Sequence, residues 1–279
     1  MEDKLLTFEN LKPGIQQVTL NVNALYPKEE QREQFKSKLS EFLSSASVHS
    51  RIFDWTGDTV VYRTECIIPA KRDRRPPLLL VFGNPASSSI DSEMFFSSEG
   101  NGREHRLWKI LSRTDILSFS PTARGCSSNE VNQLRKRELY ELSCHSAFRI
   151  GLDVYYTMPS PASKRPWAGV AGLHRLFGKE ALAMIGQHER SRLAQTVRDF
   201  VSPNGAVIAF QKDAYMALKS STSPDYSIDR ARGGDLIGSC QCDPCISLFC
   251  LPPTRLLYKE TALLREFRKR ILEADEESL

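Results

Sequence analysis

The sequence predicts an α/β fold, a three-layer αβα sandwich around a central, mainly parallel sheet of four to five strands. A continuous apolar run lies at residues 78–82, and similar, mostly apolar runs follow at 116–119, 152–156, 206–210 and 246–250. Such runs are typical of strands that are buried on both faces, as in parallel sheets. Helical patterns separate most of the runs, and strands that alternate with helices favour βαβ units.

Three of the expected helices carry one apolar face each. Their apolar positions are Leu107, Ile110 and Leu111 in the first, Leu193, Val197, Phe200 and Val201 in the second, and Leu263, Leu264, Phe267 and Ile271 in the third. In an open α/β sheet the ligand binds at the carboxyl ends of the strands. We therefore look for the chemistry directly after each apolar run.

Residues 1–75 are expected to form an N-terminal extension that packs on a core domain of residues 76–279. The extension has an irregular lead, a helix over residues 29–42 and short β-like runs over 48–68. Residues 54–58 predict a hairpin turn. A charged connector, residues 71–77, ends in two prolines before the first core strand.

The composition limits the class of protein. A chain of 279 residues with a net charge of +4 can form one sizeable domain, and its mildly basic balance permits nucleic-acid binding. No apolar stretch approaches the ~20 residues of a spanning helix, and the N-terminus lacks the order of a signal peptide. We expect an intracellular monomer, cytoplasmic or in the nucleus or nucleoid, that does not bind a membrane.

A tight turn follows the first core strand, at Gly83, Asn84 and Pro85. Gly83 permits close approach of the backbone to a ligand, and Pro85 stiffens the turn. The Asn84 side chain offers both a carbonyl and an amide, which can orient a water or the edge of a base. The alternative is an ordinary strand-to-helix turn in which Asn and Pro are turn residues.

The continuation of this turn resembles the first motif of the uracil-DNA glycosylase superfamily, and it is closest to the mismatch-specific branch. The matching positions are Gly83-Asn84-Pro85, Met94-Phe95-Phe96-Ser97 and Arg106-Leu107-Trp108-Lys109. The sequence departs from the motif in having Gly-Asn where the family has Gly-x-Asn, and Ala86 in place of its second glycine.

The resemblance implies a monofunctional DNA glycosylase of base excision repair. Such an enzyme hydrolyses the N-glycosidic bond of a flipped-out damaged or deaminated base, such as uracil, and needs no cofactor. Asn84 then positions the attacking water, Phe96 stacks on the base, and Gly83 and Pro85 belong to the base-binding turn. Stacking on an aromatic ring suits an extruded base. The alternative for Phe96 is a core aromatic residue.

The next predicted helix carries a cationic side that can meet DNA phosphates, which supply affinity independent of sequence. Its residues are Arg103, Arg106 and Lys109, followed by Arg113. The alternative is a solvated charged face. His105 can contact a phosphate or a sugar, although a surface histidine is the simpler interpretation.

Two later segments also resemble the superfamily. Thr157 and Met158 stand near the position of a base-reading Asn, and neither can make a bidentate amide contact. The second motif is expected where Leu251 replaces its His or Asn. The loop that follows would enter the minor groove as a wedge. It comprises Pro252, Pro253, Thr254, Arg255 and Leu256. A rival placement at residues 158–163 would leave the core a strand short, so we prefer the later one.

Four cysteines cluster near the C-terminal part of the chain, at Cys240, Cys242, Cys245 and Cys250. Four thiolates can bind zinc or an iron–sulfur cluster. The spacing differs from that of the iron–sulfur uracil glycosylases, and Cys250 falls in an expected buried strand. We therefore expect no metal, and an odd total of seven cysteines argues against a disulfide framework.

Two further classes of function stay open. Met158 and Leu251 favour a catalytically weak or inactive glycosylase fold that binds DNA or a damaged base without cutting it. An unrelated α/β hydrolase is the other class, but the sequence has no Gly-x-Ser-x-Gly elbow.

Overall fold

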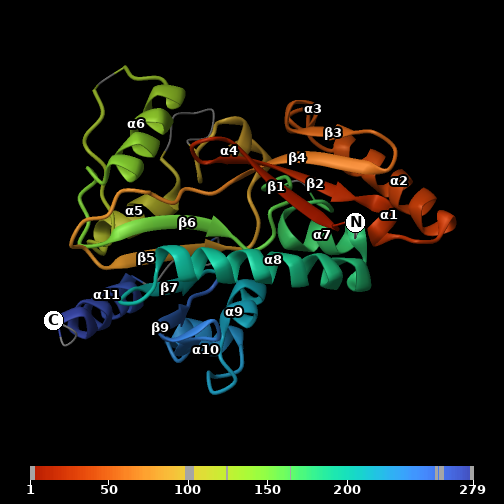
Figure 1. Ribbon diagram of the computed structural model, residues 1–279. Coiled ribbons are helices and arrows are strands. Elements are labelled where there is room, and N and C mark those ends of the chain that lie inside the picture. The colour runs from red at the N-terminus through yellow and green to blue at the C-terminus, as the bar shows by residue number, and fades with distance from the viewer. Residues whose placement is uncertain are drawn as a thin grey trace. The chain divides into compact units, whose positions relative to one another are not determined.

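A computed structural model describes residues 4–97, 104–123, 125–163, 165–254, 257 and 261–276 (Figure 1). The chain forms two compact units, and each is discontinuous in sequence. The first unit comprises residues 1–66, 84–95 and 154–191, and the second comprises residues 67–83, 96–153 and 192–279. The predicted division of the chain at residue 75 stays a prediction.

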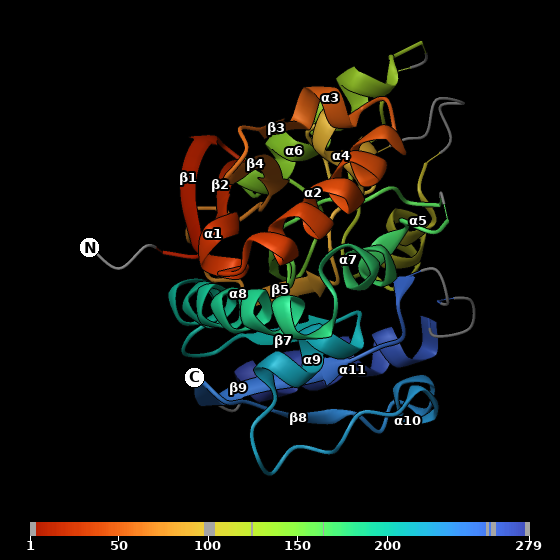
Figure 2. The same cartoon turned by 90° about the vertical axis from the view of Figure 1, so that its right-hand side faces the viewer.

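The first unit contains a four-stranded antiparallel sheet (Figure 2). Its strands, in spatial order, are β1 (Leu6–Lys12), β2 (Ile15–Asn21), β4 (Thr59–Glu65) and β3 (Phe53–Trp55). The pairing of β3 with β4 confirms the predicted hairpin. The prediction of an irregular N-terminal lead is wrong. The chain turns at Pro13-Gly14, where Gly14 has a φ of 82°, and β1 pairs with β2.

Apart from α2 (Glu29–Ser44) and α8 (Lys179–Phe200), the helices of the first unit are short. They are α1 (Val22–Leu25), α2, α3 (His49–Ile52), α4 (Ser87–Asp91), α7 (Gly169–Phe177) and the first part of α8. Helix α2 confirms the helix predicted over residues 29–42. It buries Phe35, Leu39 and Phe42, and the Phe35 ring stacks on Phe177 of α7 with centroids 5.6 Å apart.

The second unit contains a five-stranded, mainly parallel sheet, which confirms the α/β class and the predicted kind of sheet. Its strands, in spatial order, are β6 (Arg149–Val154), β5 (Pro77–Phe82), β7 (Ala206–Ala209), β9 (Asp243–Cys250) and β8 (Ile237–Cys240). Strands β5, β7 and β9 are parallel, and β8 runs antiparallel to β9 at one edge (Figure 2). Every residue of β5, β6 and β7 is buried, as the apolar runs predicted.

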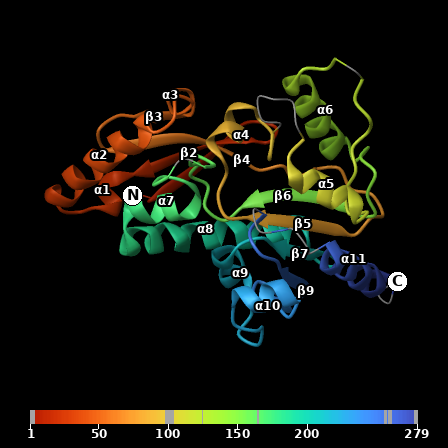
Figure 3. The ribbon, with the colours of Figure 1, turned by 180° about the vertical axis from the view of Figure 1, so that it is seen from behind.

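Within the described residues, the second unit also holds five helices besides the end of α8. They are α5 (Arg106–Arg113), α6 (Ser128–Glu141), α9 (Lys212–Leu218), α10 (Ile228–Gly233) and α11 (Thr261–Glu276). A capping box between Ser127 and Glu130 starts α6. Helix α11 lies beside α5 (Figure 3), where the Arg265 guanidinium donates to the carbonyl of Arg113 at 2.9 Å.

Two details of the expected sheet are wrong. Residues 116–119 form no strand, because the backbone N–H groups of Ile116 and Leu117 both donate to the carbonyl of Leu111 and so close the end of α5. The edge strand β8 was not expected. The run predicted at 152–156 corresponds to β6, which begins at Arg149 and ends at Val154.

None of the helices within the described residues is long and apolar enough to cross a membrane.

Candidate active site

The Asn84 side chain is held in one orientation by its neighbours within the first unit. Its Nδ2 donates to Ser160 Oγ at 2.9 Å, to the carbonyl of Met158 at 3.2 Å and to the carbonyl of Pro85 at 3.4 Å. Backbone carbonyls only accept, so the amide nitrogen must face them, and the orientation of the amide follows. The side-chain oxygen of Asn84 makes no hydrogen bond with a described residue and remains able to accept one from water.

Ser160 fixes the Asn84 amide, a contact that the sequence interpretation missed. Beyond its contact with Asn84, its N–H donates to the carbonyl of Pro85 at 3.1 Å, and its carbonyl accepts from the N–H of Ser87 at 2.9 Å. These bonds form a short parallel bridge between Ala86 and Ser160. The segment set aside as a rival second motif therefore anchors the first-motif turn. Its Met-Pro-Ser-Pro sequence was the signal that could have indicated this role.

Thr157 and Met158, expected near the base, are both buried in the first unit. The N–H of Thr157 donates to the buried carboxyl group of Glu189 at 2.7 Å, and its hydroxyl donates to the same oxygen. Since that hydroxyl has one proton, Tyr62 donates to it, across 3.0 Å. These contacts engage Thr157 in the interior. The base-binding role of the two residues stays a prediction, and their burial argues against it.

Phe96 belongs to an aromatic cluster within the second unit. Its ring centroid lies 4.7 Å from that of His105, 4.8 Å from that of Phe82 and 6.1 Å from that of Trp108. The Trp108 indole donates to the Phe96 carbonyl at 3.0 Å. Phe96 has a φ of 48°, a strained left-handed conformation, and its side chain is partly exposed. The cluster therefore fixes an aromatic ring that keeps an accessible surface.

The cationic residues of α5 differ in their contacts. The Arg106 guanidinium donates to the carbonyl of Thr254 at 2.8 Å, which ties α5 to the loop after β9. Lys109 and Arg113 are exposed, and neither side chain forms an ion pair with a described residue. His105 caps α5, since its Nδ1 accepts from the N–H of Leu107 at 3.2 Å. Arg103, the first predicted phosphate contact, lies outside the described residues.

The predicted second motif follows the carboxyl end of β9. The N–H of Leu251 donates to the carbonyl of Ala209 at 2.9 Å, so Leu251 extends the pairing with β7. Leu251 and Pro252 are buried, whereas Pro253 and Thr254 are partly exposed. A buried Leu251 gives a ligand no polar contact. Arg255 and Leu256, expected in the wedge, lie outside the described residues.

The clustered cysteines lie on the β8–β9 hairpin and differ in their environments. A hydrogen bond from the Cys240 thiol lowers the pKa of Cys242 to about 7 and, with burial, raises the pKa of Cys240. Burial raises the pKa of Cys250, and Cys245 is exposed. Within the described ranges no three His, Cys, Asp or Glu side chains come together as a metal site.

A buried histidine–serine pair is the other feature that the sequence did not indicate. His49 Nε2 lies 2.8 Å from Ser87 Oγ, and His49 Nδ1 lies 3.0 Å from the carbonyl of Phe42. The carbonyl requires a proton on Nδ1, so Ser87 donates to Nε2. A hydrogen bond of the same kind joins a nucleophilic serine to its base in many enzymes. Both residues are only 1% exposed, so the pair joins α3 to α4 in the interior.

In comparisons with known proteins, no family model matches the chain, and no curated protein is significantly similar to it.

Proposed function

We propose that the chain is a monofunctional DNA glycosylase of the uracil-DNA glycosylase type, which removes a damaged or deaminated base, such as uracil, from DNA. One observation carries the proposal. Two backbone carbonyls and a serine hydroxyl hold the Asn84 amide nitrogen, while the Asn84 side-chain oxygen is left to accept from water. The glycosylase motif that the Asn84 turn resembles implies that this oxygen holds the nucleophilic water.

The chemistry needs a water molecule and a leaving base. As the N-glycosidic bond breaks, its electron pair leaves with the base and positive charge develops on the sugar. The water oxygen then forms a bond to the anomeric carbon, and the proton that the water loses ends on the departing base or in solvent. Asn84 contributes by accepting a hydrogen bond from the water, which directs the lone pair of the water at the sugar.

The base is held by stacking in this proposal. A flipped base needs an aromatic face, and each stacked base contributes roughly 1–3 kcal/mol. Phe96 is partly exposed and is braced by Phe82, His105 and Trp108, so its ring is preorganised. A fixed ring loses less entropy when the base binds.

DNA is the partner that the proposal requires. Lys109 and Arg106 supply positive charge on α5, and the loop after β9 is joined to that helix through Thr254. A three-layer αβα arrangement around the five-stranded sheet, a monomeric state, an intracellular location and independence from cofactors belong to the same proposal.

A second function is favoured by one observation, the burial of Leu251 and Met158 at the positions where the superfamily carries polar recognition groups. Without those groups the chain would bind DNA or a damaged base with little or no cleavage. The proposed enzyme is accordingly slow, since one missing preorganised donor lowers rates by roughly 10²–10³.

The test is a gel assay on duplex and single-stranded oligonucleotides that carry uracil, hypoxanthine or other lesions. The glycosylase proposal is supported if alkali-labile abasic sites form at one of the lesions and their amount rises with the enzyme concentration. Binding to the same oligonucleotides with no abasic product across the whole panel would select the binding function instead.

A further inference from the structure

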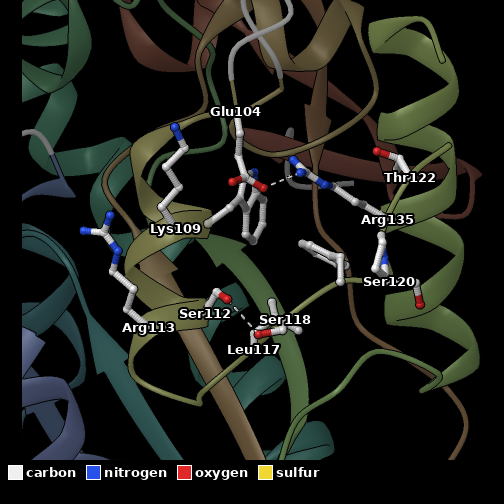
Figure 4. A pocket seen from close by; sticks show the side chains of 12 residues that line it. Glu104, Lys109, Ser112, Arg113, Leu117, Ser118, Ser120, Thr122 and Arg135 are labelled. Atoms are coloured by element: carbon white, nitrogen blue, oxygen red, sulfur yellow. Dashed lines mark hydrogen bonds and ion pairs between the residues drawn. The ribbon is translucent and has the colours of Figure 1, made fainter. Parts of the chain in front are cut away.

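The second unit contains a pocket of about 380 Å³ that is distinct from the Asn84 turn (Figure 4). Helix α5 forms one wall, residues 117–122 form the floor, and Arg135 of α6 lies on the opposite side. Among the described residues, neither Phe96 nor any residue of the loop after β9 lines the pocket.

The charges around this pocket favour an anion. Of the described residues, three cationic side chains line it, those of Lys109, Arg113 and Arg135, against one carboxylate, that of Glu104. The hydroxyl groups of Ser120 and Thr122 add donors at its exposed side. Side chains with these donors are the usual ligands of phosphate groups.

The environment of the Arg135 side chain indicates that the pocket binds an anion. That side chain is 10% exposed, and its guanidinium lies over the Phe119 ring at 5.2 Å. One nitrogen, Nη2, donates to Glu104, but the buried Nε and Nη1 have no hydrogen-bond partner in the part of the chain that the structure describes. Leaving buried donors of a charged group unsatisfied is costly, so an acceptor is expected there.

The Glu104 carboxylate binds the Arg135 guanidinium where a bound anion would bind it. Figure 4 shows the Glu104 side chain reaching across the pocket to the guanidinium of Arg135. The Glu104 side chain is 35% exposed, so water competes for it, and an entering dianion can replace it. A phosphate offers three acceptor oxygens to a guanidinium fork, whereas one Glu104 oxygen meets only Nη2.

We propose that this pocket binds a phosphate monoester, with Arg135 as its buried ligand, Lys109 as its exposed one and Glu104 as the carboxylate that the phosphate displaces. The pocket volume exceeds what one phosphate needs, so it accommodates the phosphate of a larger molecule. The ester can be a free mononucleotide or the terminal phosphate of a nicked DNA strand. The inference does not depend on glycosylase activity.

Calorimetric titration of the full chain tests the proposal. The probes are inorganic phosphate, a deoxynucleoside 5′-monophosphate, the corresponding deoxynucleoside, and a short oligonucleotide with either a 5′-phosphate or a 5′-hydroxyl. Binding of the monophosphate but not of the nucleoside is expected. A preference for the phosphorylated oligonucleotide over its 5′-hydroxyl form indicates the DNA terminus as the source, and no such preference indicates the free ester.

Variants locate the site. Lys109→Ala should weaken monophosphate binding about two- to tenfold, the effect of one lost hydrogen bond. Glu104→Gln should tighten it, because the competing charge is gone, and Arg135→Met should abolish it. The matched control is Arg137→Ala, which removes an exposed charge of α6 outside the pocket and should change nothing.

The proposal can be overturned even if the Arg135→Met protein does not fold. If the monophosphate fails to bind at about 10 mM, well above the weak affinity range of a single site, the pocket is not a phosphate site. The same holds if Glu104→Gln and Lys109→Ala leave binding unchanged. A lost glycosylase activity with retained phosphate binding would refute the proposed function alone.

Discussion

Thr157→Val separates the interior role of Thr157 from the base-binding role that the resemblance implied. The substitution keeps the shape of the side chain and removes its hydroxyl. Glu189 then loses the hydrogen bond from the Thr157 hydroxyl, and the Tyr62 phenol loses its hydrogen bond to Thr157. A hydrogen bond to a carboxylate contributes about 1.5–3 kcal/mol, and a neutral one contributes about 0.5–1.5 kcal/mol.

We therefore expect Thr157→Val to lower the free energy of unfolding by about 3 kcal/mol, allowing for incomplete additivity. The measurement is urea unfolding followed by circular dichroism, with an unchanged slope. Thr157→Ser is the matched control, because it keeps both hydrogen bonds and loses one methyl group, which costs about 1 kcal/mol. A Val variant as stable as the Ser variant would refute the network. A changed lesion preference in the folded Val variant would restore the base-binding role.

The remaining predictions concern the site and the hairpin. Phe96→Ala should reduce abasic-site formation more than it reduces binding to undamaged duplex; equal losses in the two assays would return Phe96 to a core role. Ser160→Ala, which removes one of the three acceptors around the Asn84 amide, should slow single-turnover cleavage about two- to tenfold, and an unchanged rate would contradict the anchoring. Alkylation of Cys242 by iodoacetamide should accelerate as pH rises through about 7, because the thiolate is the reactive form and the hydrogen bond from Cys240 favours it. A midpoint near 9, the ordinary thiol value, measured against Cys242→Ser would contradict this.

The sheet of the second unit was predictable because its strands are buried on both faces and therefore appear as continuous apolar runs. The same rule failed at residues 116–119. Their apolar side chains are mostly buried, but the N–H groups of Ile116 and Leu117 are used to close α5. Burial determines the pattern of apolar residues, whereas the strand also needs free backbone donors.

The N-terminal hairpin was missed for the opposite reason. Six of the seven residues of β1 are exposed, so no apolar alternation marks the strand. The Pro13-Gly14 dipeptide between the two strands was the available signal, since glycine readily adopts the positive φ of a tight turn.

The site was predictable in part. The position of Asn84 after a buried strand indicated where to look, and the resemblance to the glycosylase motif implied its role. The sequence did not indicate that Ser160, far along the chain, fixes the Asn84 amide, because that contact depends on the tertiary fold. The burial of Leu251 likewise follows from its pairing with Ala209 of β7, which no local pattern reveals.

The measurement that tests the central claim most directly is single-turnover cleavage of a lesion-containing oligonucleotide by the wild type and by Asn84→Ala, with folding checked by circular dichroism. Ser88→Ala, an exposed change in the neighbouring helix α4, is the control. The account predicts slow cleavage by the wild type, the same rate for Ser88→Ala, and a rate about 10²–10³ lower for Asn84→Ala. Full activity in a folded Asn84→Ala protein would contradict it.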